Sequence, residues 1–284
     1  MPPKSKLGQN FLRDQQAVRR IVAALGDCSG RTVVEIGPGG GAITGELATK
    51  AGRVIALEVD QALAAQLSAD FSRPEFAGEG NVVVETVDVL AFDFEAASQE
   101  SGQRLIIAGN LPYYITSPIL MKLARSAHVL DRAVLMVQRE VAERVTANPG
   151  SRDYGLLSVM VQMHGPVEPL FTLPPSAFSP APEVHSTVFR WRFSPRFEEL
   201  GIDRESFLEF LRRIFALKRK TLSNNLRAMG LEAGTIGQAF TSAGIEAKAR
   251  AEELSVETLA LLWRSLQKQG AIPVGGMATS RRSE

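Results

Sequence analysis

The stretch Asn110-Leu111-Pro112-Tyr113 places an amide, a proline and an aromatic ring at the end of an apolar run, residues 104–110. The Asn110 side-chain oxygen and the Leu111 carbonyl can each accept a hydrogen bond, and Pro112 favours an extended conformation in the residue before it. The Tyr113 ring offers a face on which a nucleobase can stack. This combination suits an amino group on a planar ring. A surface turn is the alternative, since Asn and Pro are common turn residues.

A glycine-rich turn, within the segment VVEIGPGGGAIT (residues 33–44), follows an earlier apolar run. Such a turn lets a nucleotide-type ligand approach the backbone closely, although a purely structural turn would look the same. Two carboxylates at later strand ends favour the ligand. Glu58 occupies the position where an acid commonly accepts hydrogen bonds from both ribose hydroxyls, and Asp88 could accept from an adenine amino group. Either acid alone could be a solvated charge, but together with the turn they indicate an adenosine-bearing cofactor.

The identity of that cofactor depends on the acid Glu35, two residues before Gly37. Nicotinamide dinucleotides, the alternative, use a G-x-G-x-x-G turn that holds a pyrophosphate. A carboxylate at this position repels a diphosphate and attracts a cation. S-adenosylmethionine carries an ammonium and a sulfonium group and no phosphate, so the sequence favours it.

A methyl donor at the strand ends makes residues 110–113 the candidate acceptor site. The exocyclic amine of adenine is a weak nucleophile because its lone pair is delocalised into the ring. If Asn110 and the Leu111 carbonyl accept its two hydrogens, the lone pair is directed at the sulfonium methyl. No strong general base is required. The histidines lack the spacing of a triad or a metal site and are expected to be structural or solvated: His128, His164 and His185.

Short apolar runs alternate with helix-like segments between residues 30 and 140, which predicts a parallel sheet covered by helices. The strand candidates are residues 32–37, 53–60, 81–88, 104–110 and 132–138, followed by 156–165 and 186–193. The last two would finish the sheet, with an antiparallel edge. The predicted fold class is α/β, a Rossmann-like and mostly parallel doubly wound sheet.

The composition changes near residue 195, and helical spacing of apolar residues follows in residues 205–226 and 255–270. We therefore predict a small, all-helical C-terminal domain. The expected division is a Rossmann-like domain over residues 1–195 with an N-terminal arm at 1–20, a helical domain over 196–268, and a flexible tail over 269–284.

The composition describes an ordinary folded protein: 284 residues, 45% hydrophobic and 22% charged, with a formal net charge of +1. Affinity for nucleic acid must then come from local patches. Residues 212–227 form one that contains no acid; its cations are Arg212, Arg213, Lys218, Arg219, Lys220 and Arg227. Half of these charges could instead belong to ordinary solvated helix faces.

A single cysteine, Cys28, excludes an intramolecular disulfide and a cysteine-cluster metal site. The sequence has neither the apolar stretch of a signal peptide nor a run of about 20 apolar residues that could span a bilayer. We expect a soluble, cytoplasmic protein with no membrane partner.

Eight ordered segments between about Lys4 and Arg227 carry a family resemblance. The chain resembles the bacterial small-subunit (16S) ribosomal RNA adenine dimethyltransferases, the KsgA/RsmA family. The segments are LGQNFL (7–12), VVEIGPGGGAIT (33–44), LEVD (57–60), NLPYYITSPIL (110–120), QREVAERV (138–145), YGLLSVMVQ (154–162), FSPAPEVHSTVFRW (178–191) and KRKTLSNNL (218–226).

The resemblance implies which residues form the site. It implies S-adenosyl-L-methionine contacts at Asn10, Leu12, Gly37, Glu58, Asp88 and Asn110. The implied catalytic motif is Asn110, Leu111, Pro112 and Tyr113, with Phe178 on the opposite side of the target base. It also implies that the helical domain and its basic run grip ribosomal RNA, and that no metal takes part.

The implied reaction transfers methyl groups to the N6 amines of two adjacent adenosines near the 3′ end of small-subunit rRNA, within a 30S assembly intermediate. We expect a monomer. One alternative is a large-subunit rRNA methyltransferase of the macrolide-resistance type, against which segments 178–188 and 218–226 argue. The other is a non-catalytic ribosome-assembly or transcription factor on the same fold, against which the intact motif at 110–113 and both acids argue.

Overall fold

The structure, a computed structural model, describes residues 10–73, 81–217 and 220–272 and divides into two compact units. The first unit comprises Met1–Glu143 and Gly165–Ser194, and the second comprises Arg144–His164 and Pro195–Glu284. The second unit thus takes residues 144–164 as well as the C-terminal segment. Residues 1–9 of the predicted N-terminal arm and residues 273–284 of the predicted tail lie outside the described residues.

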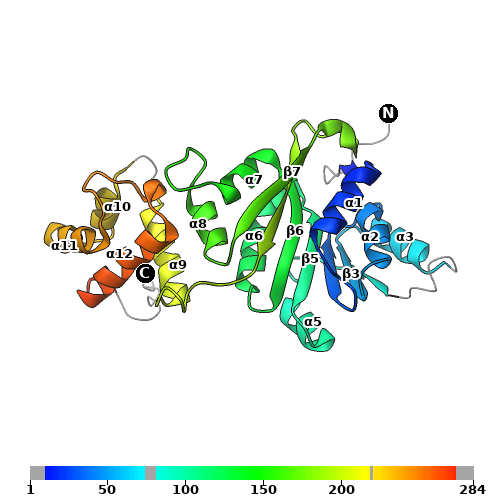
Figure 1. Ribbon diagram of the computed structural model, residues 1–284, viewed down its shortest axis with the longest axis horizontal. Helices are drawn as coiled ribbons and strands as arrows, with labels where there is room; N and C mark the ends of the chain where they lie inside the picture. Colours follow the sequence, from blue (N-terminus) through cyan, green and yellow to red (C-terminus); the bar gives the residue numbers. More distant parts are fainter. Residues whose placement is uncertain (1–9, 74–80, 218–219, 273–284) are drawn as a thin grey trace, which may run out of the picture. The chain divides into compact units, whose positions relative to one another are not determined.

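Within the described residues, the first unit is built on a seven-stranded sheet in the order β4-β3-β2-β5-β6-β9-β7 (Figure 1). Strands β2 to β6 pair in parallel, whereas β9 runs antiparallel to both of its neighbours. The predicted α/β, mostly parallel sheet is confirmed. The strands are β2 (Thr32–Ile36), β3 (Arg53–Glu58), β4 (Val82–Thr86), β5 (Leu105–Asn110), β6 (Leu130–Gln138), β7 (Val167–Leu173) and β9 (Ser186–Arg192).

The direction in which successive strands are added to the sheet reverses between β2 and β5. From β2 the chain steps outward to β3 and β4, and it then returns to place β5 on the other side of β2. Crossovers between parallel strands are right-handed, so the two directions of travel put helices on opposite faces. Figure 1 shows α1, α2 and α3 together on one side of the strands. The helices of this unit are α1 (Gln15–Ala24), α2 (Ala42–Ala48), α3 (Gln61–Phe71), α5 (Phe94–Ser101) and α6 (Thr116–Arg125), and α7 (Arg139–Thr146) runs on into the second unit.

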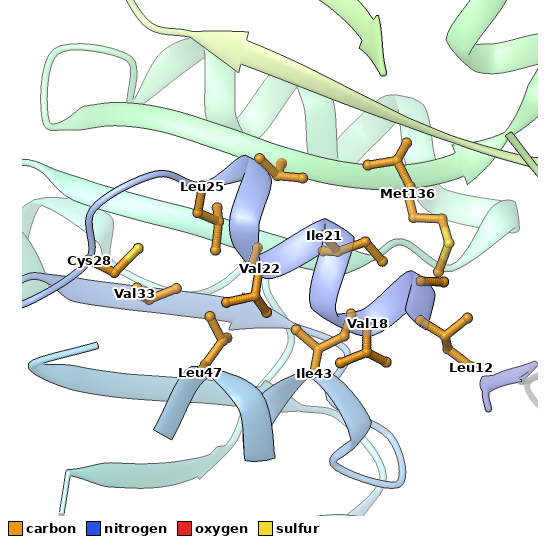
Figure 2. Close-up of a cluster of buried hydrophobic side chains, with 14 of the residues drawn as sticks. Leu12, Val18, Ile21, Val22, Leu25, Cys28, Val33, Ile43, Leu47 and Met136 are labelled. Carbon is orange, nitrogen blue, oxygen red and sulfur yellow. The ribbon is translucent and has the colours of Figure 1, made fainter. Parts of the chain in front are cut away.

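Helix α1 packs on the sheet through one apolar face (Figure 2). Its buried residues include Val18, Ile21 and Val22, which recur at the spacing of a helix face. They pack with Leu47 of α2 and with Val33 of β2 in one buried cluster. Burying each such side chain contributes about 1.5–3 kcal/mol. This packing fixes the start of α1, and with it the pocket-lining segment that precedes the helix.

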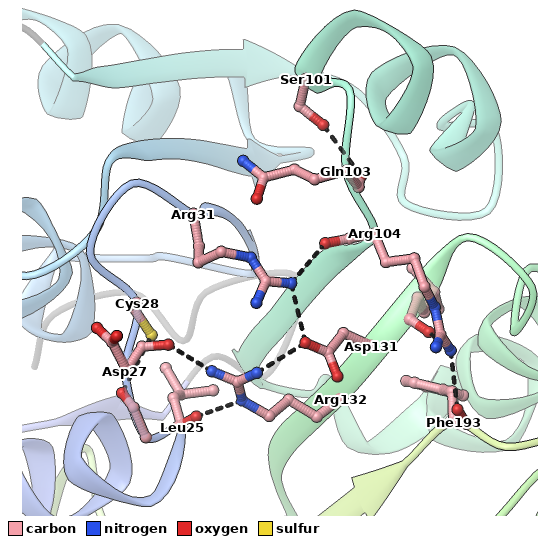
Figure 3. Close-up of polar contacts among 12 residues, drawn as sticks. Leu25, Asp27, Cys28, Arg31, Ser101, Gln103, Arg104, Asp131, Arg132 and Phe193 are labelled. Carbon is pink, nitrogen blue, oxygen red and sulfur yellow. Dashed lines mark hydrogen bonds and ion pairs between the residues drawn. The ribbon is translucent and has the colours of Figure 1, made fainter.

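Polar contacts tie the amino ends of the central strands together (Figure 3). The Arg31 guanidinium donates to the Arg104 carbonyl at 3.0 Å and pairs with the Asp131 carboxylate at 2.9 Å. Arg132 donates to the Asp27 carbonyl at 2.6 Å and also pairs with Asp131, at 2.7 Å. These contacts join the loop after α1 to β5 and β6, at the end of the sheet opposite the predicted site.

The strand predicted at residues 156–165 is wrong, because Leu156–Gln162 forms helix α8. The run is buried on several sides, and a short apolar run of this kind cannot be told from a strand by its periodicity. The Ser158 hydroxyl accepts from the Gly155 N–H at 3.0 Å and so satisfies a backbone donor at the helix start. The helix belongs to the second unit.

Strand β7 was not among the predicted strands. It lies at the edge of the sheet, the place that we expected for residues 156–165 or 186–193. Pro169 interrupts its pattern, and its pairing with β9 shifts register between Pro169 and Phe171. An edge strand tolerates proline because the missing N–H can face away from the ladder.

The second unit is helical in its described residues, in agreement with the predicted all-helical C-terminal domain. Its buried aromatic pair, Phe207 and Trp263, meets edge to face with ring centroids 5.9 Å apart. Besides α8, its helices are α9 (Arg204–Ile214), α10 (Leu222–Ala228), α11 (Ala233–Ala243) and α12 (Val256–Lys268). No helix in the described part of the chain has the length and apolar character needed to cross a bilayer.

The close approach of β5 to β2 generates a prediction at Gly109. A Cβ there would lie 2.6 Å from the Ile36 carbonyl oxygen, a backbone atom that cannot move aside cheaply. Gly109→Ala should therefore lower the thermal midpoint, as expected for overpacking that costs about 1–3 kcal/mol. The matched control is Gly45→Ala in α2, where a Cβ meets nothing within 4 Å and should be neutral or stabilising. Equal midpoints for the two variants would contradict this account.

Candidate active site

A cavity of ≈ 650 Å³ opens at the carboxyl ends of β2, β3 and β5 in the first unit. All the residues predicted to contact the cofactor line it, and so do Leu111, Pro112 and Tyr113. The sheet order explains why, since parallel strands bring their carboxyl ends to the same edge. The main lining segments are residues 10–13, 35–40, 57–59, 87–89 and 110–115.

The glycine turn brings its backbone against the end of β5. Gly37 has φ 67 and donates its N–H to the Leu57 carbonyl at 3.0 Å. A Cβ on Gly37 would lie 3.3 Å from the Asn110 carbonyl oxygen, closer than ordinary van der Waals contact. Glycine is thus required for both conformation and space. The turn and the motif at 110–113 form adjoining walls of one cavity.

Glu58 is held by two backbone N–H groups and is only 4% exposed. Its Oε2 accepts from Gly39 at 3.2 Å and its Oε1 from Asp60 at 3.0 Å. A carboxylate oxygen has two lone-pair sites, so each oxygen can accept one further hydrogen bond. This orientation fits a carboxylate that binds a pair of hydroxyl groups.

Asp88 is exposed at the cavity wall after β4. Its Oδ1 accepts from the Leu90 N–H at 2.8 Å, which fixes the side chain in a local turn. The carboxylate can accept additional hydrogen bonds from a ligand amino group.

The Asn110 amide has one end bonded and the other end free of described partners. Its Nδ2 donates to the Asn10 carbonyl at 3.1 Å. Its Oδ1 is buried, and no described residue donates to it. Because the amide nitrogen already faces Asn10, the oxygen is the end available to a ligand. A buried acceptor without a partner costs about 1–3 kcal/mol, so a hydrogen-bond donor that reaches it is favoured.

The turn after Asn110 is fixed by hydrogen bonds on both sides. The Leu111 N–H donates to the Met136 carbonyl at 2.9 Å, and the Thr116 hydroxyl donates to the Pro112 carbonyl at 3.0 Å. The Tyr113 hydroxyl lies 2.8 Å from the Ser186 hydroxyl. Tyr114 is 60% exposed and also lines the cavity.

Glu35 is buried, with 1% exposure, and no described residue donates to its Oε2. Burial raises the pKa of Glu35 to about 7; the Thr44 hydroxyl opposes this rise and the Glu58 carboxylate adds to it. The described lining residues include three acids, Glu35, Glu58 and Asp88, and one basic residue, Arg13. Such a lining favours a cation over a diphosphate.

Phe178 lies next to the cavity but not on its lining. It is 5% exposed, in the short strand β8 (Phe178–Ser179), which pairs antiparallel with β1 (Phe11–Leu12). The Arg13 N–H also donates to the Ala177 carbonyl at 2.8 Å. The segment around Phe178 therefore supports the part of the chain that carries Asn10 and Leu12.

The predicted basic run lies in the second unit. Arg212 and Arg213, in the last turn of α9, pair with Glu209 at 3.2 and 3.3 Å. The predicted run covered only residues 212–227, which contain no acid, and so did not include Glu209. Glu209 lies three residues before Arg212 and four before Arg213, a spacing at which helix side chains meet, so the sequence could have revealed these pairs. Lys220 and Arg227 are exposed, whereas Lys218 and Arg219 lie outside the described residues.

Ser186 and the Asn10 carbonyl contact the predicted motif, and sequence reasoning singles out neither of these groups. The segment 178–191 contains Ser186, but its only signal in the sequence is the family resemblance. A backbone carbonyl carries no sequence signal. Among the described residues, no group of three or more His, Cys, Asp and Glu side chains is arranged to hold a metal ion.

Comparison with known proteins assigns a family to this site. Residues 3–268 match the family model described as "Ribosomal RNA adenine dimethylase". The chain belongs to the ribosomal RNA adenine dimethylase family. It is therefore a methyltransferase that uses S-adenosylmethionine, as predicted, and its acid-lined cavity fits that cation.

Relatives of this dimethylase cover nearly the whole chain. The chain is 56% identical over 264 residues to "Ribosomal RNA small subunit methyltransferase A" of Acidobacterium capsulatum, covering 93% of this chain and 91% of the relative. The protein of the same name from Koribacter versatilis is 48% identical over 276 residues, with 93% and 95% covered. A dimethyladenosine transferase from Plasmodium falciparum superposes with a TM-score of 0.75 at 23% identity, covering 92% of this chain and 98% of that one, which shows the fold. The large-subunit and non-catalytic alternatives are not favoured.

The buried acid of this dimethylase generates a prediction about pH. The native state retains a proton on Glu35 that the unfolded chain releases above its ordinary pKa of 4.5. Native stability is therefore lost as the pH rises from about 4.5 to about 7. The glutamine in Glu35→Gln cannot ionise. The thermal midpoint of this variant minus that of the wild type, both measured without ligand, should therefore increase across this pH window and stay constant above it. Glu100→Gln, at an exposed acid, is the control. A difference in thermal midpoint that does not change with pH would contradict the raised pKa of Glu35.

Proposed function

We propose that the substrate is small-subunit (16S) rRNA within a 30S assembly intermediate, and that the products are N6,N6-dimethylated adenosines at two adjacent positions near its 3′ end. The names of the relatives with 56% and 48% identity support the choice of subunit. The observation that carries the proposal is the buried, unpartnered Oδ1 of Asn110 at the cavity that also contains Glu58 and Asp88.

The chain's own groups prepare the target amine for attack. Asn110 Oδ1 accepts one hydrogen of the adenine amine and the Leu111 carbonyl accepts the other, which localises the nitrogen lone pair. The Tyr113 ring stacks on the base and holds it beside these acceptors. S-adenosylmethionine, when bound, supplies an electrophilic methyl group on sulfur. The methylated amine is acidic enough to lose its proton to water or to the Asn110 oxygen, so no strong base is needed.

The remaining lining residues hold the methyl donor. Glu58 accepts from the ribose hydroxyls, Asp88 accepts from the adenine amine, and the Gly37 turn allows the backbone to approach the ligand. Asn10 and Leu12 close the cavity from the N-terminal side, and Asn110 contacts both ligands. Because Phe178 is 5% exposed, its contact with the target base requires its segment to move.

The helical domain grips the RNA in this proposal. Residues 196–268 supply the basic run from Arg212 to Arg227, and the Rossmann-like domain over residues 1–195 supplies the chemistry. Pairing with Glu209 reduces the net charge at Arg212 and Arg213, so Lys220 and Arg227 are the stronger described candidates for binding phosphate groups. The enzyme acts as a monomer in the cytoplasm, without a metal.

The catalytic assignment predicts that Asn110→Ala lowers turnover on the order of a hundredfold or more, because a preorganised hydrogen-bond partner is lost. Affinity for S-adenosylmethionine, measured by calorimetry, should stay within a few-fold. The assay incubates the protein with labelled donor and under-methylated small subunits, and then digests the RNA to detect dimethyladenosine. Mature large subunits serve as the control substrate. Label in the large subunit alone would refute the choice of substrate, and normal turnover by the variant would remove Asn110 from the mechanism.

The basic run predicts a change in the salt dependence of RNA binding. Lys220→Glu combined with Arg227→Glu should flatten the slope of log affinity against log salt by about one for every phosphate that the variant no longer neutralises. The matched control reverses the same number of charges at Lys50 and Arg73, which are exposed and ion-paired on the first unit. The assignment fails if both double variants change the slope equally.

A further inference from the structure

Ser186 bonds the tyrosine of the catalytic motif from a different part of the chain. Its Oγ lies 2.8 Å from the Tyr113 Oη, so either hydroxyl can donate to the other. Ser186 is 0% exposed, whereas Tyr113 is partly exposed on the cavity lining. The bond therefore joins a fully buried group to an aromatic ring that faces a ligand.

The backbone that carries Ser186 is held on both sides. Ser186 is the first residue of β9, where it pairs with Gln138 of β6 and with Leu173 of β7. A strand bonded to two neighbours has little freedom to shift, and a buried side chain has few rotamers open to it. The hydroxyl is thus a fixed point beside the cavity.

The Tyr113 ring needs such a fixed point. Its backbone is restrained by Pro112, whose φ is −62, but the side chain still turns about two torsions. The hydroxyl oxygen lies on the axis of the second torsion, so a hydrogen bond at this end of the ring restricts mainly the first torsion and holds the ring in place beside the cavity. Burial raises the pKa of the Tyr113 hydroxyl, with the Ser186 hydroxyl opposing the rise. The bond therefore stays between neutral groups at neutral pH.

We propose that Ser186 is a positioning residue for methyl transfer, which holds the Tyr113 ring in place beside the target base. The proposal rests on the stacking role of Tyr113 in the proposed function. Ser186 does not touch the base itself and is not among the residues that line the cavity. Its effect on the reaction passes through the tyrosine hydroxyl.

The same strand provides a matched control for a purely structural role. Thr187, the next residue, has its Oγ1 2.9 Å from the Thr172 Oγ1 of β7, in a bond between two hydroxyl groups like that of Ser186. Thr187 is also buried, at 6% exposure, and it is not among the cavity-lining residues. Thr187→Val removes this bond with little change in shape.

The experiment compares Ser186→Ala, Tyr113→Phe, the double variant and Thr187→Val in the subunit methylation assay. Ser186→Ala and Tyr113→Phe should each lower kcat about three- to tenfold, the effect of one neutral hydrogen bond, with an unchanged KM for the donor. The double variant should be no worse than either single variant, since one bond is shared. Thr187→Val should keep the wild-type kcat, even where its thermal midpoint falls as far as that of Ser186→Ala.

A second readout follows the base directly. RNA with 2-aminopurine at the target position fluoresces when that base leaves its stack and is quenched when it stacks on an aromatic ring. Wild type and Thr187→Val should quench equally, and Ser186→Ala and Tyr113→Phe should quench less. If Ser186→Ala does not fold, Tyr113→Phe removes the same bond from the exposed side and keeps the ring.

Two results overturn the positioning role: a wild-type kcat in Ser186→Ala, or equal losses of kcat in Ser186→Ala and Thr187→Val. Additive losses in the double variant also overturn it, since they mean that the residues act separately. Failure of the proposed function looks different, because the wild-type protein itself would then form no dimethyladenosine in small subunits.

Discussion

The hydrogen bond from the Asn110 amide to the Asn10 carbonyl fixes the orientation of a side chain that lines the cavity. It leaves the amide oxygen buried without a described donor. The carbonyl is itself held in place by chain pairing, because β1 follows immediately and pairs with β8. The orientation of one side chain thus depends on a backbone segment distant in sequence. A protein interior tolerates an unsatisfied acceptor of this kind where a ligand completes it.

Electrostatics adds a second level of selection at the same cavity. Glu58 is fixed by backbone donors, and burial raises the pKa of Glu35, which also lines the cavity, to about 7. A bound cation lowers the cost of ionising a buried acid, whereas a bound phosphate raises it. The site therefore discriminates between dinucleotides and a sulfonium donor by charge, although both fit the same arrangement of strands.

The residues predicted to contact the cofactor all line one cavity, because the signals that pointed to them are local. Strand ends, a glycine turn and a proline-containing motif each lie within a few residues, and a parallel sheet brings such ends together. The misses arise where tertiary context decides. Residues 156–165 have a pattern that burial makes ambiguous between helix and strand. The bond between Ser186 and Tyr113 depends on strand register, which no short motif encodes. The burial of Phe178 depends on its pairing with β1.

The pairing of β1 with β8 also has a consequence for when the enzyme becomes competent. Local elements such as α1 and the β2–α2–β3 crossover can form as soon as they emerge during synthesis, whereas contacts between distant segments form late. A nascent chain that has reached only β6 already contains every residue of the donor pocket. It lacks both the strand that braces the Asn10 segment and the hydroxyl beside Tyr113. The residues of the donor pocket are therefore all synthesised before the segment that braces Asn10 and before Ser186, so the complete site forms only after β8 and β9 have been made.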